Sequence, residues 1–123
     1  MEVNMMIGQT TPTFDLQAQQ FKVLTHPARL AILEILRDGE HCVCHMEAHL
    51  GYRQAYISQQ LSVLRENGII QDRRDGWNIF YRVTDRRIYD VLDAMYKLTG
   101  AVKPDINQPK SPCCCPHCAA ETK

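Results

Sequence analysis

The apolar residues change their spacing in the second half of the chain, and this change restricts the folds that the chain can adopt. Between Gln54 and Asn67 they recur at helical intervals, and Gly68 ends the pattern. Apolar and polar residues then alternate on both sides of Asp75-Gly76, a dipeptide that tolerates positive φ in a two-residue hairpin turn. The second arm of this hairpin is expected to contain Trp77, Ile79, Tyr81 and Val83. The sequence therefore predicts a helix that is followed at once by a β-hairpin.

Four other segments have helical character. The residues that indicate a first helix are Phe14, Ala18, Phe21 and Leu24. Pro27 opens a second helix that Gly39 closes, and an amphipathic stretch from His45 to Leu50 ends at Gly51, a residue suited to a left-handed turn. A last helix is expected from about Asp85 to Thr99. We expect a mainly α fold with a small β-hairpin, in the order α-α-α-α-β-β-α.

Residues 45–50 and 54–67 are two short helices with a tight connection, which is the helix-turn-helix arrangement. The second helix of such a pair presents polar side chains to the major groove of double-stranded DNA, and the hairpin after it forms a wing. The residues expected to read bases are Gln54, Tyr56, Ser58 and Gln59. Those expected near phosphates are Arg53, Arg65, Arg73 and Arg74.

The net charge of the chain is zero, but the charges are distributed unevenly. Residues 51–87 hold seven arginines and four acidic residues, hence a net charge of +3, whereas residues 1–50 hold three basic and six acidic residues. A basic segment at the predicted helix-turn-helix can approach phosphates. A solvated basic face would have the same composition, so charge alone leaves both interpretations open.

With 123 residues and 45% hydrophobic content, the chain is expected to form one small domain. We expect a flexible N-terminal arm at residues 1–12, a DNA-binding and dimerisation domain at residues 13–101, and a Pro/Cys-rich tail at residues 102–123. The last helix has more apolar surface than one such domain can cover, which predicts a symmetric homodimer. The sequence has no export signal and no run of 18 apolar residues, so we expect a cytoplasmic protein without membrane contact.

Six cysteines fall in two clusters, one before the predicted reading helix and one in the tail. The members are Cys42 and Cys44, then Cys113, Cys114, Cys115 and Cys118. Because the cell interior keeps thiols reduced, the clusters indicate metal binding or thiol sensing. Cys115 and Cys118 have the two-residue gap that lets two sulfurs meet one metal ion. His41, His45 and His49 would share one face of a helix, and His45 is the best candidate nitrogen ligand.

These features together resemble the ArsR/SmtB family of winged helix-turn-helix repressors, over residues 14–99. The residues that carry the resemblance are Leu24, His26, Pro27, Arg29, Leu30, Ile32 and Leu33, then Glu40 to Met46 with the Cys-Val-Cys, then Ser58 to Leu61, Leu64 to Ile70, Arg74, Gly76 and Tyr81. Members of this family are not enzymes. They repress an operon as dimers and leave the DNA when an effector binds, and the resemblance implies this activity here.

The chain departs from the family at positions that affect the choice of ion. In arsenic sensors of this family the Cys-Val-Cys is followed by Asp-Leu and a third cysteine, whereas here those positions hold His45, Met46 and Glu47. Residues 85–99 contain no histidine and no cysteine, which argues against the family's zinc, nickel or cobalt site and against its persulfide-sensing type. The family's frequent His-His pair on the reading helix is Gln59-Gln60 here, so no operator sequence can be transferred.

Closely spaced thiolates prefer soft ions, with three sulfurs for arsenite or lead and four N/S ligands for cadmium or zinc. We expect a repressor that dissociates when arsenite or antimonite binds, with cadmium or lead next and zinc as an alternative. The tail would complete the ligand shell of Cys42 and Cys44. On a helix these two residues point about 200° apart, so an ion that binds both is expected to require extended or distorted backbone and to shift the reading helix.

Other functions compete with this one. The spacing of Cys115-Pro116-His117-Cys118 occurs in dithiol oxidoreductases, but those enzymes place the pair at the start of a helix in a βαβ fold. A repressor that responds to oxidation would pair Cys42 or Cys44 with a tail thiol. In a metal buffer protein the winged helix would only mediate association.

Overall fold

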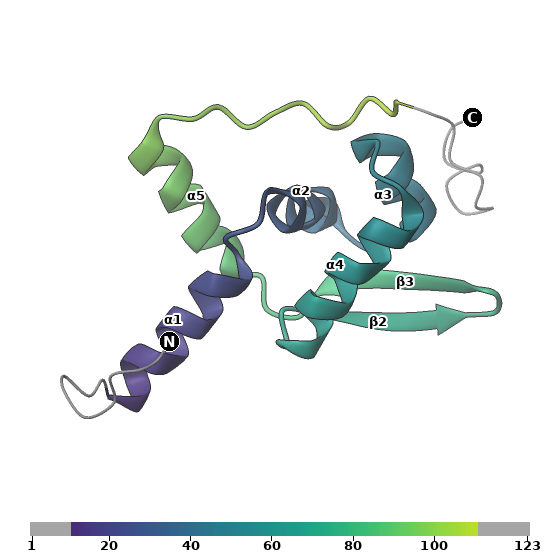
Figure 1. Ribbon diagram of the computed structural model, residues 1–123. Helices are drawn as coiled ribbons and strands as arrows, with labels where there is room; N and C mark the ends of the chain where they lie inside the picture. Colours follow the sequence, from purple (N-terminus) through teal and green to yellow (C-terminus); the bar gives the residue numbers. More distant parts are fainter. Residues whose placement is uncertain (1–10, 111–123) are drawn as a thin grey trace.

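The computed structural model of the protein describes residues 11–110. It confirms the predicted order of helices and hairpin, and it adds a short strand and one turn of 3-10 helix (Figure 1). The elements are α1 (Pro12–Val23), α2 (Pro27–Ile35), the 3-10 turn η1 (Leu36–Asp38), β1 (His41–Cys42), α3 (Val43–Leu50), α4 (Gln54–Glu66), β2 (Ile70–Asp75), β3 (Asn78–Val83) and α5 (Ile88–Thr99).

The ends of the helices follow from local chemistry. Pro27 opens α2 as predicted, and Gly51 ends α3 with a φ of 80°, in the left-handed region that its sequence position indicated. The start of α5 is later than expected, because Asp85 stays outside the helix and accepts a hydrogen bond from the amide of Arg87 (3.0 Å). The side chain of Arg87 also binds this carboxylate, and these contacts lower the pKa of Asp85 to about 2.

The hydrophobic core lies between α2, α3, α4 and one face of the sheet, and α5 closes it at one side. The largest fully buried side chains are Ile32, Leu33, Leu36, Met46, Ile57, Leu61 and Leu64. Three of them come from one face of α4, as the helical spacing predicted. The opposite face of α4 therefore remains in solvent, which is the requirement for a helix that reads DNA.

The sheet has three antiparallel strands in the order β1-β3-β2, and its first strand was not expected from the sequence. In β1, His41 pairs with Tyr81 and Cys42 pairs with Phe80. The segment before α3 is therefore extended and hydrogen-bonded to the wing. Two residues are too few for a recognisable alternation, so this strand exists because β3 offers it a pairing edge.

The placement of Trp77 on the second arm of the hairpin was wrong. The last pair of the ladder is Asp75 with Asn78, so Gly76 and Trp77 form the turn, with Gly76 at a φ of 64°. The side chain of Trp77 is 99% exposed. Apolar alternation continued across the turn in the sequence, which made a turn residue look like a strand residue.

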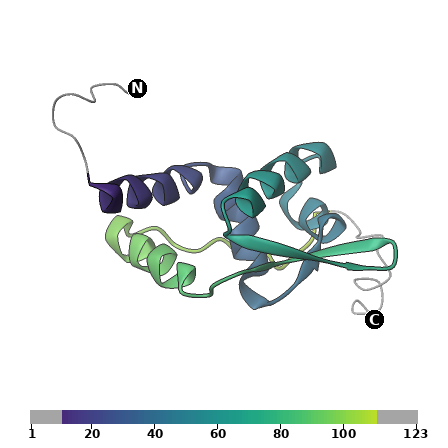
Figure 2. The ribbon, with the colours of Figure 1, turned by 90° about the horizontal axis from the view of Figure 1, so that it is seen from below.

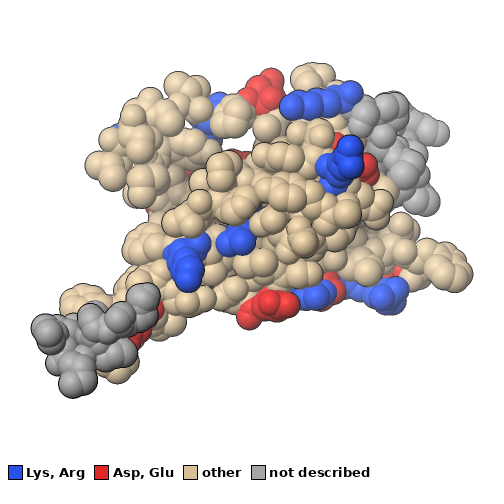
Figure 3. All heavy atoms as spheres, in the orientation of Figure 1, with Lys and Arg blue, Asp and Glu red and all other residues tan. Residues whose placement is uncertain are grey.

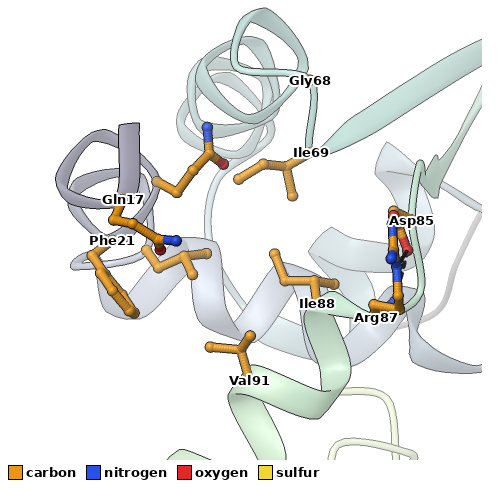
Figure 4. Close-up of a pocket in the computed structure, with 10 residues that line it drawn as sticks. Gln17, Phe21, Gly68, Ile69, Asp85, Arg87, Ile88 and Val91 are labelled. Carbon is orange, nitrogen blue, oxygen red and sulfur yellow. Dashed lines mark hydrogen bonds and ion pairs between the residues drawn. The ribbon is translucent and has the colours of Figure 1, made fainter. Parts of the chain in front are cut away.

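The helices α1 and α5 lie side by side at one end of the molecule (Figures 1 and 2). A groove of about 430 Å³ lies between them, where Phe21 of α1 and Val91 of α5 stand on opposite walls and Ile69 and Ile88 project into it (Figure 4). The exposed large apolar side chains of the two helices are Phe14, Leu16, Phe21, Val91, Met95 and Leu98. The surplus apolar surface expected on α5 is present, and α1 extends it.

Residues 101–110, here called the C-terminal strap, run from α5 over α2 to the end of α3 (Figure 1). At the α5 end, the ammonium group of Lys103 lies 3.2 Å from the carboxylate of Asp93. At the α3 end, Nδ1 of His49 donates to the carbonyl oxygen of Ile106 (2.6 Å), and the amide of Lys110 donates to the carbonyl oxygen of Ala48 (2.6 Å). The strap therefore joins the fifth helix to the third. No helix in residues 11–110 is long and apolar enough to cross a membrane.

The hydroxyl of Tyr89 gives a test of the packing of α5 on the core. This buried hydroxyl donates a hydrogen bond to the carbonyl oxygen of Leu33 (2.7 Å), and burial raises its pKa. We expect Tyr89→Phe to lower the free energy of unfolding by about 1–2 kcal/mol, because it leaves the Leu33 carbonyl unpaired. Urea unfolding followed by circular dichroism, at fixed protein concentration, measures this change.

The matched control is Tyr52→Phe, because the contact of Tyr52 within residues 11–110 is a ring contact with Tyr56 and not a hydrogen bond of its hydroxyl. We expect this variant to stay within about 0.5 kcal/mol of the wild type. Equal destabilisation by the two variants would contradict the role assigned to the Tyr89 hydroxyl.

Candidate DNA-binding and effector sites

The outward face of α4 presents three of the four residues predicted to read bases. Gln54, Ser58 and Gln59 are exposed, and the preceding residue, Arg53, is exposed at the helix start. Tyr56 is half-buried instead, with its ring 5.3 Å from that of Tyr52. Its ring also lies 6.3 Å from that of His26, so Tyr56 is less available to bases than the three exposed residues.

Gln60 has a structural role that the sequence analysis did not assign. It is 7% exposed, and its amide oxygen accepts a hydrogen bond from Nε of Arg29 (2.9 Å). Arg29 also donates to the carbonyl oxygen of Val23 (3.0 Å), so it joins α4 to the end of α1. Gln60 lies three residues after Ile57 on the buried face of α4, and this spacing was the available signal.

The arginines predicted near phosphates divide into two groups. Arg65 forms an ion pair with Asp72 (3.2 Å), and Arg73 binds both carboxylate oxygens of Glu40 (2.7 and 3.1 Å). Arg53 and Arg74 form no ion pair with any residue in the range 11–110, and both are exposed. Basic and acidic side chains alternate along the lower edge of the molecule, below the hairpin (Figure 3). Arg53 and Arg74 are therefore the arginines most available to phosphates.

Cys42 and Cys44 lie in one small cluster beneath the wing. Cys42 is the last residue of β1 and the residue before α3, with extended backbone (φ −91°, ψ 171°), and Cys44 lies in the first turn of α3. Cys42 is 4% exposed and packs with Phe80, and Cys44 is half-buried against the same cluster. Extended backbone is thus present at Cys42 but not at Cys44, so an ion that binds both thiolates is still expected to distort this segment.

The two thiols do not form a complete metal site with other described residues. Within residues 11–110, no three or more His, Cys, Asp or Glu side chains are arranged to hold a metal ion. The other predicted ligands, Cys113, Cys114, Cys115 and Cys118, lie outside the described residues. Two soft thiols in one cluster suit a thiophilic ion, provided that further ligands come from elsewhere in the chain.

The three histidines near this cluster stack on one another. The ring of His45 lies between those of His41 and His49, at centroid distances of 3.8 and 4.1 Å. Nε2 of His41 is 2.9 Å from the carboxylate of Asp38, and His49 is bonded to the strap. The histidines line a cleft of about 390 Å³ between α2, α3 and the strap. Both faces of the His45 ring are covered, so His45 would have to leave the stack to join the cysteines.

Comparison with known proteins identifies the family. Residues 26–72 match the family described as bacterial regulatory proteins of the arsR family. A biofilm growth-associated repressor of Xylella fastidiosa is 41% identical over 81 residues, which are 66% of this chain and 71% of that protein. The arsenical resistance operon repressor of Escherichia coli is 40% identical over 73 residues, which are 58% of this chain and 62% of the repressor.

Solved structures agree with the fold described above. The crystal structure of Rv0081 from Mycobacterium tuberculosis has a TM-score of 0.67 and 35% identity, and the match covers 74% of this chain and 92% of that one. The homodimeric winged helix-turn-helix domain of Mb0332 from Mycobacterium bovis has a TM-score of 0.65 and 25% identity, with coverage of 76% and 89%. The chain therefore belongs to the ArsR/SmtB family of winged helix-turn-helix transcriptional regulators, which bind DNA and are not enzymes.

Proposed function

We propose that the protein is a cytoplasmic homodimeric repressor that binds operator DNA and is released by a thiophilic ion. One observation carries this proposal. The two thiols, Cys42 and Cys44, lie in the segment that pairs with the wing through β1 and packs on the reading helix through α3. An ion held by these thiols acts directly on both DNA-contacting elements.

The proposed dimer is supported by the apolar surface of α1 and α5. Phe14, Leu16 and Leu98 are each more than 60% exposed there, at 64%, 63% and 78%. A second copy would cover these side chains, which removes apolar area from water. The homodimeric state of the Mycobacterium bovis domain supports the same arrangement. Two reading helices on one dimer would then contact two half-sites of an operator.

The proposed DNA contacts are those of the exposed residues. Gln54 and Gln59 can form bidentate hydrogen bonds to base edges, and Ser58 adds a single hydroxyl. Arg53 and Arg74 contact phosphates, and Arg65 and Arg73 do so only after exchanging their carboxylate partners. Tyr56 contributes mainly by supporting the helix.

The effector is proposed to be arsenite or antimonite, with cadmium or lead next and zinc last. Cys42 and Cys44 supply two thiolates, and tail cysteines supply one or two more, with Cys115 and Cys118 first and Cys113 and Cys114 as alternates. Similarity to an arsenical resistance operon repressor supports placing arsenite first. His45 is a weaker candidate because its ring is stacked on both sides.

The strap supports a site within one chain. Lys110 is hydrogen-bonded to Ala48, and Ala48 lies four residues after Cys44, about 6 Å along the axis of α3. Cys113 follows Lys110 by three residues and Cys118 by eight, which allow spans of roughly 10 and 27 Å. The tail cysteines can thus reach Cys44 of their own chain without crossing the dimer.

Release from DNA would follow from the loss of the contacts around Cys42. A thiolate that binds an ion leaves the apolar contact with Phe80, and β1 moves relative to β3. The wing and α4 then lose the spacing that matches the operator. A coupling free energy of about 1–3 kcal/mol would weaken operator binding roughly 5- to 150-fold.

The thiol variants test this proposal. We expect Cys42→Ser and Cys44→Ser to bind an operator duplex, selected from a random-sequence pool with the wild-type protein, within about 3-fold of wild-type affinity. They should remain bound when arsenite releases the wild type, because neither retains both thiolates. Fluorescence anisotropy of labelled duplex, under anaerobic conditions, measures both properties.

The same titration with antimonite, cadmium, lead, zinc and copper ranks the ions, and an oxidant without metal separates ion sensing from oxidation sensing. Release of either variant at the wild-type arsenite dose would refute the proposed site. Cys42→Ala serves as a second variant, since an alanine keeps the pocket beneath Phe80 apolar.

A mixed dimer tests whether the ligands come from one chain. One subunit carries Cys42→Ser and Cys44→Ser, and the other carries serine at all four tail cysteines. If each site lies within one chain, neither subunit has a complete site, and we expect no tight arsenite binding by isothermal calorimetry. One site per mixed dimer would show instead that the tail crosses to the partner.

A further inference from the structure

Trp77 is the most exposed large apolar residue of the described chain, and it lies at the tip of the wing. Its side chain is 99% exposed, whereas the next most exposed, Val102, is at 88%. The hairpin that carries it projects beyond the helices in both views of the ribbon (Figures 1 and 2). Trp77 is also the only tryptophan in the chain.

The fold does not require an indole at this position. Gly76 supplies the positive φ of the turn, and the ladder of the hairpin is complete from Ile70–Val83 to Asp75–Asn78. A fully exposed side chain contributes no buried area to the core, and exposed indoles favour association. The presence of a tryptophan at this position is therefore better explained by contact with a binding partner than by a contribution to the stability of the fold.

The surroundings of Trp77 match DNA better than protein. Arg74 lies in the strand just before the turn, exposed and without an ion pair among the described residues, and Asn78 follows the tryptophan. A cation beside an apolar wedge suits the minor groove, where the cation faces phosphates and the wedge faces base edges. Binding of α4 in a major groove brings the wing to the adjacent minor groove.

From this placement we infer that Trp77 inserts into the minor groove beside each half-site and stacks on a base step, an inference that rests on the proposed operator binding. Insertion of an apolar side chain partly unstacks a step and bends the duplex. Pyrimidine–purine steps such as TA and CA unstack most easily. The wing then selects sequence at positions that α4 does not reach, and a dimer makes two such contacts.

The single tryptophan makes this inference directly measurable. The emission of the wild-type protein is recorded with the selected operator duplex and with acrylamide as a quencher. We expect operator binding to change the emission intensity about 2-fold and to protect the indole from acrylamide several-fold, as stacking on a base covers its face. An unrelated duplex of equal length should have little effect at moderate salt.

Two substitutions separate stacking from phosphate contact. We expect Trp77→Ala to weaken operator binding roughly 5- to 100-fold, and Trp77→Phe to stay within about 5-fold, with the salt dependence unchanged in both. Arg74→Ala should instead reduce the slope of log affinity against log salt by about 2, because the dimer loses two phosphate contacts. Thermal melting of the three variants should match the wild type, because both residues are exposed.

The inference would be overturned if saturating operator left the emission and the quenching unchanged and Trp77→Ala bound with wild-type affinity. The proposal that the protein binds an operator would still stand. Protection of the indole in the free dimer, lost on dilution, would show that Trp77 contacts a second copy and would also overturn the inference. Failure of the wild type to select any duplex would refute the proposed function itself.

Discussion

The pairing of β1 with β3 is the interaction on which the rest of the structure depends. It makes His41 and Cys42 the third strand of the wing sheet, and it places the thiol of Cys42 beneath Phe80. The extended backbone at Cys42 also precedes the first residue of α3. Cys42 therefore both pairs with β3 of the wing and precedes the first residue of α3, the helix that packs on α4. Glu40 adds a further link, because its carboxylate holds Arg73 of the wing.

A second set of contacts connects this segment to the proposed dimer surface. The carboxylate of Asp93 on α5 binds Arg37 (2.9 Å) and Lys103 (3.2 Å), and hydrogen bonds from Arg37 lower its pKa, so it stays ionised. The strap continues from Lys103 to His49 at the other end of α3. A displacement of α3 would thus pull on the C-terminal strap, which is bound to α5 through Lys103. In the proposed dimer, the reading helices would in this way be connected to the surface that sets their spacing.

The sequence predicted the features that depend on local periodicity. The buried stripe of α4, a hairpin that follows it and the left-handed end of α3 at Gly51 were all expected and are present, although the turn is Gly76-Trp77 and not Asp75-Gly76. The strand β1 could not be predicted, because its two residues pair with partners about forty positions later in the chain. Trp77 was misplaced because apolar alternation does not distinguish a turn from an arm.

The candidate sites were predictable in composition but not in arrangement. Gln54, Ser58 and Gln59 are exposed, as a base-reading role requires, whereas the buried Gln60 is bonded to Arg29, thirty-one residues away. Spacing in the sequence identified Cys42 and Cys44 as a pair. The two residues share a cluster because the backbone changes from strand to helix between them. The pattern of residue types in the sequence does not indicate this change.

The central claim is that an ion bound to Cys42 and Cys44 opens the pairing between β1 and β3 of the wing. Amide hydrogen exchange of β1 and β3, measured by NMR on the DNA-free protein with and without one equivalent of arsenite per subunit, tests it most directly. The account predicts that the amides bonded between β1 and β3 exchange at least about 10-fold faster when the ion is bound, while the buried residues of α4 keep their protection. Unchanged exchange across this strand pair, with the ion fully bound and the operator released, would contradict it.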